Sequence, residues 1–262
     1  MLINFTLAPL ENIVPWGQPG SYRLHWFGLT YGEYWIQAGD ASLFEYSDHA
    51  QIAGAGRYCD YQVVRLYEDL TDMLPDIMEP VPGPLAHFVF GEQAKILRDA
   101  CDAWCAGSDD GPDADHRFEL TVTASTWSKK RHLGSAYLAP SADIAIWSDH
   151  DRVHIEWDNR DRRFAGEPAW SATLGNHQMP RDQFVEEMRS FHDRLMEQMA
   201  ARVDQAASGH LPPEIQVDVP GLIREHEQRT RSFDAALKLV PRTDWQLVEK
   251  AIGEVLTVGN GS

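Results

Sequence analysis

The spacing of hydrophobic residues along this 262-residue chain changes from the two-residue period of strands to the helical period and back. Apolar and polar side chains alternate through the first 47 residues, which predicts a β-meander with a strand over residues 24–27 and a hairpin turn at 38–40. Helical spacing follows over residues 63–74, up to a proline that is expected to end the helix, and again over 96–104, in a second helix that is expected to end at Gly107. A chain with both periods combines a sheet with helices, so purely helical folds are excluded.

The two-residue period returns in the middle of the chain, at residues 118–124, 144–147 and 153–157. Successive strands joined by short polar turns predict an antiparallel sheet, with one further strand near Trp170. These strands are expected to follow the N-terminal meander and to be covered by helices on at least one face.

The last third of the chain is predicted to be helical. A long amphipathic helix is expected from Pro180 to about residue 203, a second helix over 222–239, and a third from Thr243. Thr243 and Gln246 have the spacing of a capping box, which marks a helix start. We therefore predict an α+β fold: an antiparallel β-sheet, made of the N-terminal meander and the central strands, packed by helices, with a helical C-terminal third.

Composition predicts one compact domain over residues 1–262, because 43% hydrophobic residues supply a sizeable core. Residues 75–84 and 209–213 are candidate seams, although neither has the composition of a flexible linker. The chain has neither the roughly 18 consecutive apolar residues of a membrane-spanning helix nor the start of a signal peptide. Its three cysteines lack a pairing pattern, which fits a reducing compartment. We expect a cytoplasmic protein.

The charge balance excludes some partners and favours another. Forty acidic residues against 23 basic ones give a net charge of −17, and the first 115 residues carry 18 acidic and only 5 basic residues. Nucleic acids and anionic membrane surfaces bind through Lys and Arg, so neither is an expected partner. The charge predicts a basic protein partner, bound by carboxylates of the acidic segment: Asp69, Asp72, Asp76, Glu79, Asp99, Asp102, Asp109 and Asp110. A solvated acidic face that keeps the protein soluble is the alternative.

Familiar catalytic and metal-binding motifs each lack a required residue. There is no Gly-Lys pair for a P-loop and no G-x-S-x-G elbow, and Gly54-Ala55-Gly56 lacks the third glycine of a dinucleotide fingerprint. His226-Glu227 begins a zinc-protease motif, but Thr230 stands where the second histidine is needed. We expect no metal and no cofactor.

Two clusters of polar and aromatic residues remain as candidate sites. The first is His25-Trp26-Phe27-Gly28, and the second is the run from Trp157 to Asp161 at the end of a predicted strand. Asp158, Asn159 and Arg160 fit an ion pair beside an asparagine-stabilised turn. Alternatively they line a pocket rimmed by tryptophan, in which Trp26 and Asn159 bind a small polar ligand.

Segments 9–17, 24–29, 157–160 and 243–245 carry a resemblance that extends over nearly the whole chain. In these segments the sequence resembles a family of uncharacterised bacterial proteins, abundant in actinobacteria, that is known only as a domain of unknown function. The resemblance implies one shared architecture. It supplies no catalytic residue, and it makes a familiar enzyme class less expected.

The sequence leaves three hypotheses for the function. The first is a non-enzymatic acidic protein-binding protein, for example an immunity-type or antitoxin-type neutraliser of a basic toxin. The alternative is a hydrolase or transferase in which His25 acts as base, Asp158 orients it and Arg160 clamps an anion. That site requires the three side chains to converge in space. A structural subunit that uses the helix at 222–239 is the third.

Overall fold

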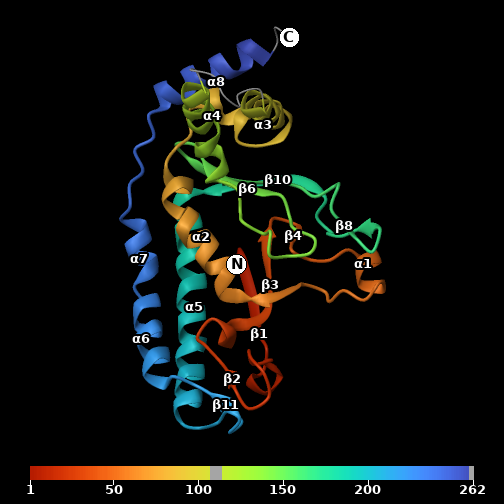
Figure 1. Cartoon of the computed structure of the whole chain (residues 1–262), viewed down its shortest axis with the longest axis vertical. Coiled ribbons are helices and arrows are strands. Elements are labelled where there is room, and N and C mark those ends of the chain that lie inside the picture. The colour runs from red at the N-terminus through yellow and green to blue at the C-terminus, as the bar shows by residue number, and fades with distance from the viewer. Residues whose placement is uncertain (107–113, 260–262) are drawn as a thin grey trace.

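Strands and helices combine in an α+β arrangement, as predicted, in the computed structural model, which describes residues 1–106 and 114–259 (Figure 1). The first sheet is built around the long strand β3 (Tyr31–Ala38), which pairs antiparallel with β1 (Ile3–Leu7), β4 (Ala41–Leu43) and β5 (Cys59–Gln62). The predicted hairpin turn between β3 and β4 is confirmed, with Gly39 at a φ of +64° that favours glycine.

The strand predicted over residues 24–27 is wrong. The strand β2 covers only Tyr22–Arg23 and pairs in parallel with β11 (Ile215–Gln216), and a 3-10 helix follows at Gly28–Thr30. Leu24 and Trp26 are buried and His25 is exposed, so burial alternates as in a strand, but the segment pairs with no neighbouring strand and turns into the 3-10 helix. The hydroxyl of Thr30 donates to the carbonyl of Phe27 at 2.7 Å and so stabilises the turn.

The second sheet has the order β10-β7-β6, with β6 (Ile144–Ser148), β7 (Arg152–Asp158) and β10 (Leu174–Pro180) all antiparallel. The predicted strands at 144–147 and 153–157 are confirmed. Near Trp170 the chain forms only an isolated bridge to Tyr46, after the short strands β8 (Arg163–Phe164) and β9 (Glu167–Pro168).

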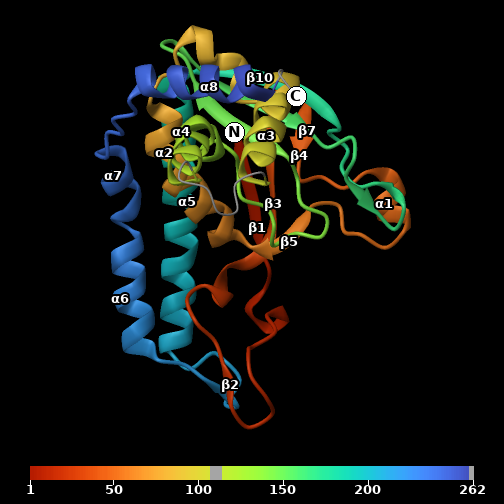
Figure 2. The same cartoon turned by 45° about the horizontal axis from the view of Figure 1, so that its top comes forward.

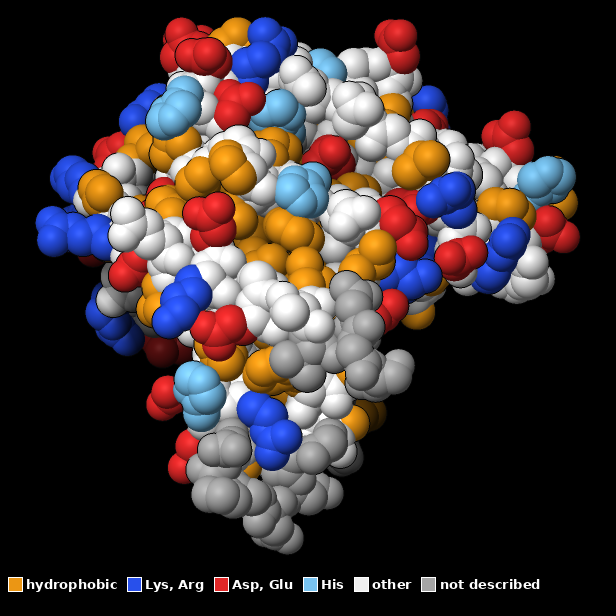
Figure 3. Space-filling view, turned by 90° about the horizontal axis from the view of Figure 1, so that it is seen from above, with side chains coloured by type: hydrophobic (Ala, Val, Ile, Leu, Met, Phe, Trp, Pro, Cys, Tyr) orange, Lys and Arg blue, Asp and Glu red, His pale blue; other side chains and the backbone are white. Residues whose placement is uncertain are grey.

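The strand predicted over residues 118–124 is also wrong, because these residues belong to the helix α4 (Ala114–Lys129). Alternating apolar residues on a helix fall on two sides, since positions four apart share a face. Phe118 and Val122 are exposed, whereas Thr121 and Ala124 are buried. Apolar side chains therefore lie among charged ones of both signs at this end of the molecule (Figure 3).

Helix α2 (Val63–Met78) continues through Pro75, where the sequence predicted its end. A proline inside a helix costs about 3 kcal/mol, mainly through a lost hydrogen bond and a clash with the preceding turn. Leu74 and Ile77 are fully buried on either side of Pro75, so the apolar face that α2 buries continues past the proline and offsets this cost. The long helix α5 (Arg181–Ala207) starts directly after Pro180, as predicted.

The helix predicted over residues 222–239 is divided into α6 (Val219–Arg229) and α7 (Ser232–Leu237). The hydroxyl of Ser232 donates to the carbonyl of Arg229 at 2.7 Å across the break. This hydrogen bond lies where α6 ends, and Phe233, in the first turn of α7, is fully buried.

The last helix, α8 (Trp245–Gly259), starts where it was expected but has a different cap. The carboxylate of Asp244 accepts from the N–H of Leu247 at 3.0 Å, which is the side-chain contact of an N-cap. Thr243 instead donates its N–H and its hydroxyl to Glu79, so the predicted capping box is wrong.

Two hydrophobic clusters lie on opposite faces of the second sheet. Ile144 and Ile146 of β6 join the larger cluster, with the first sheet, α2 and α5. Ala145 and Trp147 point the other way, into a smaller cluster with α3 (Gly91–Ala106), α4 and α8. In Figure 1 these three helices lie above β6 and β10, while α2 and α5 lie below. Because both its faces are covered, β6 is buried along its whole length.

Candidate functional site

A groove of about 700 Å³ lies between α3 and the second sheet. Its walls come from the first turns of α3, from the chain leaving β7 and from the start of β10. A second pocket of about 220 Å³ continues it between α3 and α4. Ala94, Arg98 and His132 line both cavities, so the two form one continuous site.

Three carboxylates of the groove already have partners. The Glu156 carboxylate accepts from the indole N–H of Trp147 at 2.7 Å. Asp158 and Arg160 form a two-point ion pair, at 2.9 Å and 2.6 Å, and the Arg160 hydrogen bonds hold the pKa of Asp158 below its ordinary value.

The third partnered carboxylate is that of Asp143, which lies 3.6 Å from Nδ1 of His132. The other ring nitrogen of His132, Nε2, donates to the carbonyl oxygen of Val89 at 2.9 Å. These two contacts fix the orientation of the His132 ring in the site.

Several cations of the site, in contrast, have no counter-ion. Lys95, Arg98 and Arg162 line the groove and form no ion pair with any described residue. Lys129 adds a fourth cation of this kind in the smaller pocket. Glu92, Glu156 and Asp161 line the groove without an ion pair in the described chain, so carboxylates offset its cations, whereas no carboxylate lines the smaller pocket.

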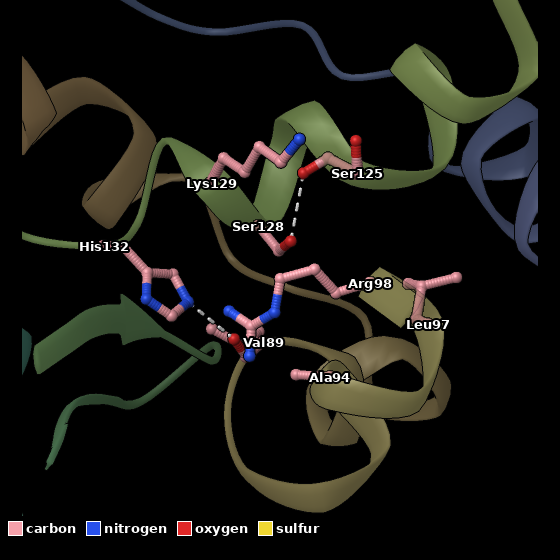
Figure 4. A pocket seen from close by; sticks show the side chains of 8 residues that line it. All are labelled: Val89, Ala94, Leu97, Arg98, Ser125, Ser128, Lys129 and His132. Atoms are coloured by element: carbon pink, nitrogen blue, oxygen red, sulfur yellow. Dashed lines mark hydrogen bonds between the residues drawn. The ribbon is translucent and has the colours of Figure 1, made fainter. Parts of the chain in front are cut away.

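The smaller pocket has cationic donors on two sides (Figure 4). Arg98 reaches from α3 into the space between the helices, and His132 points in from the segment after α4. The hydroxyl of Ser125 donates to the carbonyl of Thr121 at 2.8 Å, and the hydroxyl of Ser128 donates to the carbonyl of Ser125 at 3.1 Å. Positive charge in this pocket therefore comes from Arg98 and Lys129.

The structure brings together two of the three residues of the predicted enzyme site. Asp158 and Arg160 line the groove, but His25 contacts the ring of Trp16, with centroids 5.5 Å apart. His25 follows β2, which lies at the opposite end of the molecule from β7 and β10 (Figure 2). The histidine of the groove is instead His132, which the sequence analysis did not single out because it follows a segment that reads as a strand.

Trp26 and Asn159, the predicted ligand-binding residues, are both buried and line neither cavity. Asn159 accepts from the N–H of Asp143 at 2.8 Å and donates to the carbonyl of Ala172 at 3.1 Å. This amide thus holds the chain at the exit of β7, as in an asparagine-stabilised turn. Trp26 packs its ring under the guanidinium of Arg229, 4.4 Å away.

The carboxylates predicted to bind a partner are dispersed. Asp69, Asp76 and Glu79 form ion pairs with Arg65, Lys130 and Arg131, at 3.5, 3.8 and 3.3 Å. Asp72 on α2, and Asp99 and Asp102 on α3, are exposed. Asp109 and Asp110 lie outside the described residues, as does Gly107, where the second predicted helix was expected to end.

The part of the chain that the structure describes contains no group of three or more His, Cys, Asp or Glu side chains placed to hold a metal ion. No described helix combines the length and apolar character that crossing a membrane requires.

A family model described as "Family of unknown function (DUF5984)" matches residues 2–251. The chain belongs to DUF5984. No curated protein and no solved structure matches this DUF5984 protein. The predicted resemblance to a family of unknown function over nearly the whole chain is thereby confirmed.

Proposed function

We propose that this DUF5984 protein binds a small organic anion, bearing a phosphate or carboxylate group, in the groove between α3 and the second sheet, with the anionic group in the smaller pocket that continues it. The observation that carries the proposal is the lining of that pocket: Arg98 and Lys129 form no ion pair with a described residue, and no carboxylate lines the pocket. Such cations in a concave site offer charge-assisted hydrogen bonds to an anion.

The dimensions of the site support a small molecule. Ligand pockets in proteins usually have volumes of roughly 300–1,000 Å³, and the groove alone has about 700 Å³. Arg98 borders both cavities, so it is the cation best placed to contact a ligand that spans them. A net charge of −17 repels anions at long range, so recognition depends on contacts inside the site, within a Debye length of about 8–10 Å.

The proposal is one of binding, because the structure does not assemble the predicted enzyme site. His132 lines the groove instead, with Nε2 donating to the Val89 carbonyl and Nδ1 3.6 Å from the Asp143 carboxylate. The hydrolase or transferase role predicted around His25, Asp158 and Arg160 has no support from this geometry, because His25 lies elsewhere.

The test is calorimetric titration of the whole protein with two probes, inorganic phosphate and citrate. Arg98→Gln is expected to weaken binding of at least one probe about tenfold, because one charge-assisted contact is lost. Arg242→Gln, an exposed arginine between α7 and α8, is the matched control and is expected to bind like the wild type. Absence of binding to the wild type, or equal affinities for the two variants, would refute the proposal.

The protein-binding role and the cytoplasmic location remain predictions from the sequence. A basic partner would meet fewer free carboxylates than the sequence indicated, since Asp69, Asp76 and Glu79 are paired internally. Asp72 is the unpaired exposed carboxylate of α2.

A further inference from the structure

The outer edge of β10 has no neighbouring strand. The second sheet has the order β10-β7-β6, so β10 borders it on one side and β6 on the other. The outer side of β6 is covered, because the chain at residues 131–133 hydrogen-bonds to its main chain at 2.8 and 2.9 Å. In the first sheet, α5 covers β1, and Arg194 of α5 donates to the carbonyl of Ile3 at 2.6 Å. No segment of the described chain covers β10 in either way.

The main-chain groups of Leu174, Asn176 and Gln178 point away from β7. Residues that are hydrogen-bonded across an antiparallel pair alternate with residues that are not. Asn159 donates its N–H to the carbonyl of Thr173 at 2.6 Å, so the bonded positions along β10 are Thr173 and every second residue after it. The three residues between these positions therefore direct their N–H and C=O groups outward, to the free edge.

This free edge lacks the features that usually prevent pairing with another chain, namely charged side chains, a proline or a bulge within the strand. Residues 174–180 include no Lys, Arg, Asp or Glu, in a chain of which 24% is charged. Pro180, which has no N–H to donate, stands only at the end of the strand. The three outward residues are exposed, Leu174 to 54%. The one side chain that contacts these groups is that of Arg152, 3.3 Å from the carbonyl of Gln178, among the described residues.

The edge is also complementary to itself. When two identical strands meet across a two-fold axis, each residue faces the same partner in both directions. An axis at Asn176 places the two copies of this residue opposite each other, and Leu174 opposite Gln178 of the partner subunit. All three are outward positions, so each facing pair can exchange two N–H···O=C bonds. No facing pair brings like charges together, which would destabilise the contact.

We infer that two copies of this chain associate through β10, which joins their second sheets into one continuous antiparallel sheet around a two-fold axis at Asn176. The partner subunit also completes the groove, because Leu174 and Asn176 line it at this edge. Side chains that face each other across two strands lie on the same side of the sheet, so Gln178 of the partner subunit borders the groove beside Leu174. The inference goes beyond the anion-binding function and does not depend on it, since no cation of the groove takes part in the pairing.

Salt distinguishes this association from the binding of a basic partner. Each copy carries a net charge of −17, so the two copies repel each other at long range. Salt screens this repulsion, whereas it weakens attraction between opposite charges. Raising the NaCl concentration from about 50 to about 500 mM is therefore expected to lower the Kd of the dimer.

The test is sedimentation velocity of the whole protein over a range of concentrations, in which the wild type is expected to show a monomer–dimer equilibrium. Asn176→Lys places two like charges face to face at the axis and is expected to raise the dimer Kd about tenfold. Thr6→Lys adds the same charge at an exposed strand position of the first sheet and is the control, expected to associate like the wild type. Far-UV circular dichroism verifies that both variants are folded.

Hydrogen exchange measured by mass spectrometry locates the interface. The amides of residues 174–178 are expected to be protected more strongly at high than at low protein concentration, because the outward N–H groups are bonded only in the dimer. A wild type that stays monomeric up to about 0.1 mM overturns the inference and leaves the edge to a different chain. A dimer that Asn176→Lys and Thr6→Lys affect equally also overturns it, since the interface then lies on another surface.

Discussion

The guanidinium of Arg131, which has no solvent exposure, lies 3.3 Å from the carboxylate of Glu79. The same carboxylate accepts the N–H and the hydroxyl of Thr243, at 2.9 Å and 2.6 Å, directly before α8. The guanidinium of Arg131 also lies beside the rings of Trp127 and Trp245, 5.9 Å and 5.4 Å from their centroids. Glu79, which the sequence predicted to bind a partner, therefore connects the ends of α2, α4 and α8 inside the protein.

Glu79→Ala is expected to lower the free energy of unfolding by about 3–5 kcal/mol, because it leaves a buried guanidinium without its counter-ion. Urea denaturation monitored by tryptophan fluorescence measures the change. Asp102→Ala, at an exposed carboxylate on α3, is expected to stay within about 0.5 kcal/mol of the wild type. A similar stability for both variants would show that the Arg131–Glu79 contact has no structural role.

Gly175→Ala is expected to destabilise the protein by about 1–3 kcal/mol. Gly175 pairs with Trp157 across β10 and β7, and a Cβ atom there would lie 2.5 Å from Cζ2 of the indole ring. Gly253→Ala is the matched substitution within α8, where a Cβ atom would meet nothing within 4 Å. It is expected to stabilise the protein by about 0.5–1 kcal/mol, since alanine favours helix. Urea midpoints that move in the same direction would contradict this prediction.

Asp69 is expected to make stability depend on pH. Burial raises its pKa to about 6, and the unfolded chain has the ordinary value near 3.8. Between these values the folded protein binds more protons than the unfolded one, so the contribution of Asp69 to stability is present below pH 4 and is lost as the pH rises through 6.

Asp69→Asn removes this titration, so the variant is expected to gain stability relative to the wild type as the pH is raised from 4 to 7. Urea denaturation at a series of pH values measures the difference. Asp99→Asn, on the surface of α3, is expected to show no such trend. A constant difference between Asp69→Asn and the wild type across this range would show that the Asp69 pKa is not raised by folding.

Inorganic phosphate is expected to stabilise the wild type against heat through the groove cations. A ligand at 100 times its Kd adds about 2.7 kcal/mol to the free energy of unfolding. A tenfold weaker Kd for Arg98→Gln reduces this to about 1.4 kcal/mol at the same phosphate concentration. Differential scanning calorimetry of both proteins, with and without phosphate, measures the two shifts. Equal shifts would show that the stabilisation arises elsewhere.

Periodicity is sufficient to predict those elements that bury a single face. The alternation along β7 predicts Val153 and Ile155 in the core, and both are fully buried. The helical spacing from Phe184 to Val203 likewise predicts the buried face of α5. In such elements the spacing of the hydrophobic residues matches the period of the strand or helix, so the same pattern predicts both the secondary structure and the buried side chains.

Packing between distant segments sets the helical state of α4, the course of α2 past Pro75 and the residues that line the groove. Residues 118–124 have the period of a strand, yet packing of α4 against α3 and α8 makes them helical. His132 and Asp143 come together across a turn, and Arg98 joins them from another helix. Contacts between segments distant in sequence leave no periodic signal, and the energy of packing them exceeds the local preferences that a sequence pattern reports.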